Sequence, residues 1–267
     1  MGFFTYLKHS DNNILDALII GATENANFPA NNLKALPISK PYRSTDGSIT
    51  GQKIRIDYPF SKNTDQVALI NHNLSPTATI TLNGGTTPDP DGGEFTTPIT
   101  WRETNAFINL SATQTFENWA ILIEDESNTF GFINAGYIGM GMKTTFDFGF
   151  NFGWQFSDRV VNIELETEFG AKDIAAMYRR VILSLIFEHL TETQGTTLRD
   201  FYLDLQRNST PFFLVPDVSV NDGYFGRITN ELKRTISTGK RVRAPIVFQG
   251  DSLGKVIDQL PTFHFEV

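Results

Sequence analysis

The spacing of short apolar segments is the feature that most constrains the fold. Residues 53–58 alternate apolar and polar side chains, residues 66–70 form a short apolar run, and residues 79–82 alternate again before an Asn-Gly-Gly turn signal. Residues 119–124 form another apolar segment. Alternation with a period of two is typical of a half-buried strand. Strands every ten to fifteen residues without a convincing helix predict a β-sandwich or jelly roll in the first half.

The second half adds one helix to the strands. Residues 180–187 are almost continuously apolar, which predicts a buried strand. Thr191 and Gln194 have the spacing of a capping box. One helical face is then formed by Leu198, Phe201, Tyr202 and Leu205. Because Gly195 weakens the first turn, we expect the helix near residues 196–207.

The chain is therefore predicted to be mainly β and to consist of two modules. A glycine-punctuated strand at residues 131–141 closes the first module or leads out of it; this module is an N-terminal β-sandwich over residues 1–142. Residues 143–267 form a C-terminal β-barrel or β-sandwich with one packed α-helix. Hydrophobic residues make up 40% of the 267 residues, enough to fill a core in both modules.

Charge and composition exclude several classes of function. Residues 1–128 hold eight lysines and arginines against fourteen acidic residues, and residues 129–267 hold fourteen against sixteen. Neither half offers the positive field that a phosphate backbone needs, so we expect no nucleic-acid partner. The chain has no cysteine, which excludes disulfides and thiolate metal sites and fits assembly in a reducing cytoplasm. No apolar run approaches the ~20 residues that span a bilayer, and the N-terminus has no signal-peptide pattern, so we expect no membrane insertion.

Two stretches of sequence resemble known modules. The first half carries Ala-Thr-Glu-Asn (residues 22–25), Phe-Pro-Ala-Asn-Asn-Leu (28–33), Tyr-Arg-Ser-Thr (42–45) and Val-Ala-Leu-Ile-Asn-His-Asn-Leu-Ser (67–75). This set resembles the discoidin-like, galactose-binding-like module of many bacteriophage minor tail proteins. In the second half, a strand at residues 180–190 and a helix at 198–205 precede Pro-Phe-Phe-Leu-Val-Pro-Asp (211–217) and Val-Phe-Gln-Gly-Asp-Ser-Leu-Gly (247–254). That order is similar to the ring-forming module of phage distal tail proteins.

The resemblance implies a structural subunit of a phage tail tip. In that family the distal tail protein forms a hexameric ring between the tail tube and the tail hub, and its outer module anchors tail fibres or contacts host glycans. The implied location is the tail tip of the virion, after assembly in the cytoplasm of the host bacterium. No catalytic motif and no cofactor come with the resemblance. The sequence also contains no Gly-x-Ser-x-Gly elbow and no phosphate-binding glycine loop, so we expect no enzymatic activity.

Carbohydrate binding is the alternative function, with four candidate residues. Trp101 and Tyr42 offer aromatic faces that stack on sugar C–H groups, and the neighbouring Arg102 and Arg43 offer hydrogen-bond donors. Trp101 follows a long Pro-, Gly- and Asp-rich loop and is the best exposed candidate, whereas Trp119 opens an apolar strand and is expected in the core. For Arg43, a structural role in which the guanidinium binds loop carbonyls is favoured over sugar binding.

The same long loop offers a candidate calcium site. Asp89, Asp91 and Glu94 provide carboxylates at nearly alternate positions, and carboxylate oxygens are the ligands that Ca²⁺ prefers. Their spacing does not match the twelve-residue calcium-binding loop, and loops of this composition also occur as simple turns. No two histidines have the spacing of a helical metal pair.

Overall fold

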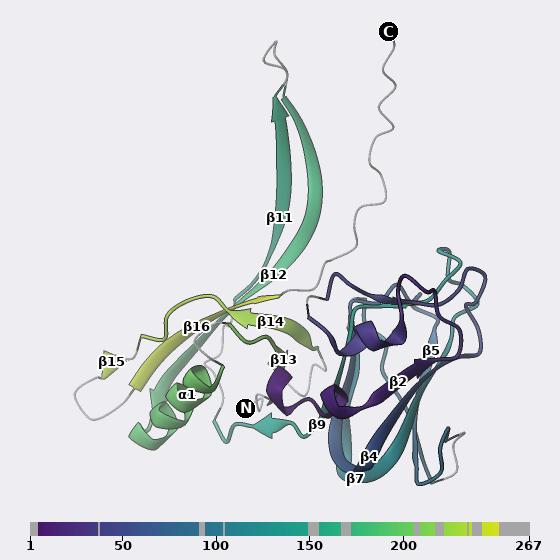
Figure 1. Ribbon diagram of the computed structural model, residues 1–267. Helices are drawn as coiled ribbons and strands as arrows, with labels where there is room; N and C mark the ends of the chain where they lie inside the picture. Colours follow the sequence, from purple (N-terminus) through teal and green to yellow (C-terminus); the bar gives the residue numbers. More distant parts are fainter. Residues whose placement is uncertain are drawn as a thin grey trace.

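The computed structural model confirms a mainly β chain with one α-helix (Figure 1). It describes residues 5–36, 38–90, 94–103, 105–148, 155–166, 172–205, 209–216, 222–233, 235–236 and 242–250. Within these ranges, the strands form a six-stranded sheet, an eight-stranded sheet and a two-stranded sheet. No helix in the described ranges has the length and apolar character required to cross a membrane.

The first unit is a β-sandwich made by two long, bent strands. Strand β4 (Gln52–Ile70) pairs antiparallel with β7 (Asn105–Glu124). The first half of β4 pairs also with β2 (Leu18–Gly21), and the second half of β7 pairs with β5 (Thr79–Gly85), which pairs with β6 (Phe95–Pro98). The second half of β4 pairs instead with β9 (Tyr137–Gly141).

The bend lies where the β4–β7 register breaks. The pairing shifts between Asp57 and Lys62 and again between Thr64 and Gln66. Irregularities of this kind let one strand leave one layer and enter the facing layer. Trp119 is fully buried between the layers, as predicted, and residues 52–58 alternate between buried and partly exposed side chains.

Short segments complete the unit: the 3-10 helices η1 (His9–Asp11), η2 (Asn13–Asp16) and η3 (Ala30–Lys34), and the paired strands β3 (Tyr42–Arg43) and β8 (Asn134–Ala135).

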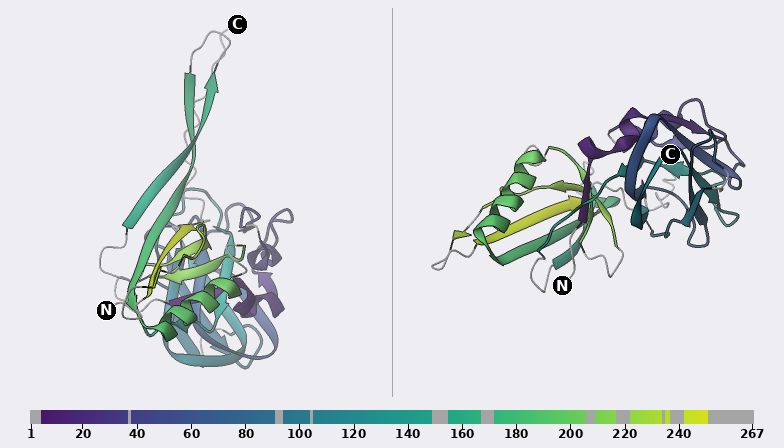
Figure 2. Two further views of the ribbon diagram at one scale, coloured as in Figure 1. Left: turned by 90° about the vertical axis from the view of Figure 1, so that its left-hand side faces the viewer. Right: turned by 90° about the horizontal axis from the view of Figure 1, so that it is seen from below.

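The second unit is an open sheet with a helix on one face (Figures 1 and 2). Its strands run in the order β10 (Thr144–Thr145), β1 (Thr5–Lys8), β13 (Phe212–Val215), β14 (Tyr224–Ile228), β16 (Val242–Gly250), β12 (Lys172–Leu190) and β11 (Gln155–Glu166), with β15 (Thr235–Ile236) beside β16. The described strands do not close into a barrel. Helix α1 (Glu192–Asp204) buries Leu198 and Phe201 against the core of this sheet.

The helix begins at Glu192, four residues before the predicted start. The predicted capping box is present: the Thr191 hydroxyl accepts from the Gln194 backbone N–H at 3.2 Å, and the Gln194 side chain accepts from the Thr191 N–H at 3.0 Å. These two bonds satisfy helix-end donors and offset the low helix propensity of Gly195, which is buried.

The first described strand belongs to the second sheet. Strand β1 pairs with β13 and β10, although it comes from the start of the predicted first module. Local patterns do not reveal a partner about 200 residues away. The module boundary near residue 142 stays a prediction.

An apolar cluster joins the two units, and we call it the junction cluster. It consists of Leu7, Ile38, Ala68, Ile70, Phe107, Tyr137, Phe213, Val215 and Phe225. The Phe107 and Phe213 rings meet edge to face at 5.3 Å, and Tyr137 and Phe225 lie 5.1 Å apart. Gly223 lies beside Phe213 and Phe107, where a Cβ atom would clash with the Phe213 ring and crowd the Phe107 ring. The units therefore share a packed interior, which favours a fixed relative orientation.

Removing an aromatic ring from the junction cluster tests whether the packing between the two units stabilises the fold. We expect Phe213→Ala to lower the free energy of unfolding by about 3–5 kcal/mol, because the large cavity lies at the contact between both units. The control Phe60→Ala removes a ring that is 57% exposed and should cost less than about 1 kcal/mol. Urea unfolding followed by tryptophan fluorescence and circular dichroism measures both. Equal losses for the two variants would contradict a structural role for the junction.

Candidate glycan-binding groove

The main candidate site is a groove at one end of the sandwich, which we call the Trp101 groove. Its volume is about 660 Å³. It is formed by the loop after β4, the segment between β6 and β7, the loop after β7, and the segment before β3. The lining residues are Ile38, Ser39, Pro41, Asn71, His72, Asn73, Leu74, Ser75, Pro76, Trp101, Glu103, Ser127, Asn128, Thr129, Phe130 and Asn134. A cavity of this size is typical of small-ligand sites.

Two aromatic side chains line the groove. Trp101 is half-buried and packs against the sandwich core, and its indole N–H donates to the Leu74 carbonyl at 3.1 Å. That hydrogen bond fixes the orientation of the ring. Phe130 is 41% exposed on the loop after β7. The groove therefore presents one fixed aromatic ring and one exposed ring to a ligand.

The polar lining is held rigid by a network around Asp125. This carboxylate is 1% exposed and accepts from the Ser75 backbone N–H at 2.8 Å, from the Ser75 hydroxyl and from the Asn128 amide at 3.1 Å. Asn73 donates to the Phe132 carbonyl at 2.8 Å and accepts from the Asn134 N–H at 2.8 Å. The side chains that line the groove are thus positioned before a ligand arrives, which lowers the entropic cost of binding.

His72 contributes an uncharged ring to this lining. Its Nδ1 accepts from the Leu74 backbone N–H at 3.2 Å, and the residue is 8% exposed. Burial lowers the His72 pKa to about 4, although the Arg102 backbone and the Asp125 charge oppose the shift. The ring is therefore neutral at pH 7. His72 is thus a strand-end residue whose ring bonds the backbone.

The four predicted glycan residues do not lie together. Of these, only Trp101 lines the groove. Tyr42 is completely buried and donates its hydroxyl proton to the Thr23 carbonyl at 2.8 Å, so its ring faces are not open to a sugar. Its position on β3, packed against the Gly21 backbone, makes it part of the core.

The two arginines have partners within the chain. Arg43 pairs with Asp46 at 2.6 Å and lies over the Phe132 ring at 3.5 Å. Arg102 donates to the Trp101 carbonyl at 2.9 Å, and its Nε lies 3.6 Å from the Asp222 carboxylate. These contacts within the chain give each arginine a structural role that needs no bound sugar.

The candidate calcium residues also have other partners. Asp89 pairs with Lys53 at 2.9 Å, and Glu94 accepts from the Thr86 N–H and hydroxyl at 2.8 and 2.7 Å. Hydrogen bonds from Thr86 hold the Glu94 pKa below its usual value. Asp91 lies outside the described residues. Among the residues that the structure does describe, no three His, Asp or Glu side chains are grouped to hold a metal ion.

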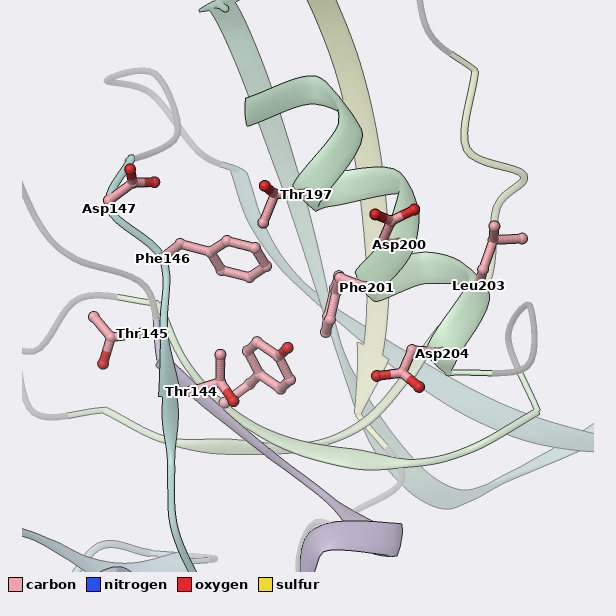
Figure 3. Close-up of a pocket in the computed structure, with 10 residues that line it drawn as sticks. Thr144, Thr145, Phe146, Asp147, Thr197, Asp200, Phe201, Leu203 and Asp204 are labelled. Carbon is pink, nitrogen blue, oxygen red and sulfur yellow. The ribbon is translucent and has the colours of Figure 1, made fainter. Parts of the chain in front are cut away.

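A second cavity, of about 740 Å³, lies between β10 and α1 (Figure 3). Its carboxylates are Asp147, Asp200 and Asp204, and Asp204 forms an ion pair with Lys8. The Phe146 and Phe201 rings between them are 3% and 4% exposed and pack edge to face at 5.4 Å. Because these faces are covered by one another, this cavity offers a ligand less aromatic surface than the Trp101 groove.

Sequence reasoning identified Trp101 but missed the asparagines and Phe130. Asn71 and Asn73 follow β4, Asn128 follows β7 and Asn134 lies on β8, and only the folded chain brings these three segments together. The Asn-His-Asn turn after residue 70 was the available signal. Phe130 carried no pattern that distinguishes it from a core phenylalanine.

The buried, neutral His72 predicts a pH dependence of stability. Its folded pKa of about 4 lies below the unfolded value of 6.5, so its contribution is present above pH 6.5 and is lost as the pH falls toward 4. Between pH 7 and pH 4, we expect titration of His72 to lower the free energy of unfolding of the wild-type protein by about 3 kcal/mol. The variant His72→Asn keeps an acceptor for the Leu74 N–H and should lack this part of the decrease. Urea unfolding of both proteins between pH 7 and pH 4 measures this. Parallel stability curves would show that the ring is not buried in its neutral form.

Comparison with solved structures finds distant similarity to carbohydrate-binding modules. No protein-family model and no curated protein matches the chain. Among solved structures, the family 32 carbohydrate-binding module of C. perfringens NanJ, in complex with galactose, is 14% identical, with 53% of this chain and 99% of that module covered at a TM-score of 0.40. Chitosan-binding module 1 of the chitosanase/glucanase from Paenibacillus sp. IK-5 is 14% identical, with 49% and 98% covered at a TM-score of 0.40.

A Streptococcus pneumoniae fucose-binding module, SpX-3, is 12% identical, with 49% of this chain and 97% of the module covered at a TM-score of 0.39. Each module aligns over nearly its whole length with about half of this chain. Identities and TM-scores this low are a likeness of β-rich architecture and do not define a ligand for this chain.

Proposed function

We propose that this chain is a non-enzymatic glycan-binding protein that uses the Trp101 groove. The observation that carries the proposal is the groove itself, in which Trp101 and Phe130 accompany a lining of asparagine and serine side chains. Sugars present apolar C–H faces and many hydroxyl groups. Aromatic rings bind the faces, and amides and hydroxyls exchange hydrogen bonds with the hydroxyl groups.

The charges around the groove support binding rather than hydrolysis. Glycoside hydrolysis typically requires two carboxyl groups on either side of the scissile bond. Among the described lining residues, Glu103 is the one carboxylate. Asp125 lies behind the lining, is 1% exposed and is bonded to Ser75 and Asn128. This arrangement supplies no acid–base pair to a bound sugar.

A glycan array comparing wild type with Phe130→Ala tests the proposal. Phe130 is exposed, so truncation removes a ligand contact with little loss of core packing. We expect at least a tenfold loss of affinity, the equivalent of about 1.4 kcal/mol of lost contact. Phe60→Ala removes a similarly exposed ring that does not line the groove and should bind as wild type does. Absence of any glycan signal for the wild-type protein would refute this function.

A structural role in a phage tail tip is the second candidate, and the β11–β12 ribbon favours it. Residues 172–181 of β12 pair only with β11 among the described strands, because the β12–β16 pairing begins at Ile182. This outer part projects from the body as a two-stranded ribbon (Figures 1 and 2). An isolated two-stranded hairpin is marginally stable in water, so a ribbon of this length favours a partner that covers it.

In this second proposal the partners are further copies in a ring, the tail tube, the tail hub and tail fibres, and the location is the virion. This role and glycan binding use different surfaces of the chain. The ribbon belongs to the second unit and the groove to the first.

Shortening the ribbon tests the structural role. Replacing residues 160–179 with Asn-Gly joins Arg159 and Arg180, which face each other in the register, by a favoured two-residue turn. We expect wild-type oligomers to become monomers while glycan binding is unchanged, as measured by light scattering after gel filtration. A wild-type protein that stays monomeric at high concentration would count against assembly, as would oligomers that persist without the ribbon.

A further inference from the structure

The charged side chain that lines the Trp101 groove is acidic. The described residues that line it include no lysine and no arginine, and they include one acidic residue, Glu103, which is exposed. The buried Asp125 carboxylate lies directly behind Ser75 and Asn128 and adds a second negative charge. The described lining residues therefore place negative charge, and no cation, directly beside a ligand.

The cations of the flanking segments do not line the groove. Lys40 is exposed in the segment before β3, between two lining residues, but it is not itself a lining residue. Arg102 follows Trp101, but its guanidinium donates to the Trp101 carbonyl and faces Asp222. Arg43 is stacked on Phe132 and paired with Asp46. Each arginine is partnered by a carboxylate of this chain. Bringing either to a ligand would break an existing ion pair.

The uncharged donors of the groove are suited to neutral groups. Asn71 and Asn134 carry amides, and Ser39 and Ser127 carry hydroxyls. The His72 ring is neutral at pH 7 and its Nε2 is buried, so it adds neither a charge nor an available donor. Amides and hydroxyls can replace the water around a sugar hydroxyl. They do not replace the hydration of a full carboxylate charge without a cation.

We infer that the Trp101 groove selects neutral and amine-bearing sugars over sugars that carry a carboxylate, and that Glu103 sets this selection. The inference rests on the proposed glycan-binding function and names its ligand class. An ammonium group on the sugar gains an ion pair with Glu103, whereas a sugar carboxylate is repelled by Glu103 and Asp125. Because Glu103 is exposed, its effect is modest and weakens as salt screens it.

Matched sugars that differ in one group test the inference. The probes are galactose, galactosamine and galacturonate, with glucose, glucosamine and glucuronate as a second series, titrated by protein NMR at pH 7. We expect the amine-bearing sugar to bind about threefold to fivefold more tightly than its neutral counterpart in low salt. The uronate should bind at least fivefold more weakly than the neutral sugar.

Variants at Glu103 test the sugar selectivity separately from glycan binding itself. Glu103→Gln should abolish the preference for the amine and leave affinity for the neutral sugar within about twofold, and Glu103→Lys should allow the uronate to bind. Glu117→Gln, at an exposed position on β7 that does not line the groove, is the matched control and should change neither. A uronate that binds wild type as tightly as the neutral sugar overturns the selectivity alone. If none of the six sugars and no glycan on the array binds, the glycan-binding function fails and the selectivity fails with it.

Discussion

The contact between the sandwich and the open sheet, made by the junction cluster, is the interaction on which the candidate site depends. One of its residues, Ile38, lies in a segment that forms the groove, and two others, Ile70 and Phe107, lie on the strands that adjoin such segments. Ile38 itself lines the groove, and Ile70 directly precedes Asn71 and His72. The backbone of Phe107 exchanges two hydrogen bonds with Thr100, the residue before Trp101. Packing at the junction therefore fixes three of the segments that surround the ligand space.

Polar contacts across the same boundary extend this effect. The Asn105 amide donates to the Gly223 carbonyl at 3.2 Å, and its oxygen accepts from the Asn71 N–H at 3.4 Å. The Arg102–Asp222 pair spans the boundary as well. The orientation of Trp101 thus depends on residues more than 100 positions away in the chain. A groove built this way is rigid because it is anchored in two packed cores rather than in one mobile loop.

Local signals in the sequence predicted local structure. The alternating residues 53–58 and the capping box of Thr191 report on neighbours within a few positions, and both are confirmed. The pairing of β1 with β13 and the bend of β4 depend on partners far along the chain, which no periodicity encodes. The site residues were predicted only in part for the same reason, because the groove is formed by segments that are far apart in the chain. Trp101 could be named because it follows a loop of unusual composition, whereas no local pattern around Tyr42 shows that its ring is buried in the core.

The two proposed roles are compatible because the surfaces that carry them are separate but rigidly joined. A single groove with one exposed aromatic ring and neutral hydrogen-bonding groups is suited to weak binding of one sugar. An assembly of several copies would present several such grooves at fixed spacing, and linked sites gain avidity of roughly 10²–10⁴ without any new contact. The junction cluster would transmit that fixed spacing from the β11–β12 ribbon in one unit to the groove in the other. A mobile linker between the units would reduce that gain, since each groove would sample many orientations. If both proposals hold, the packed aromatic junction would couple self-assembly to multivalent glycan binding, because it fixes the groove relative to the ribbon.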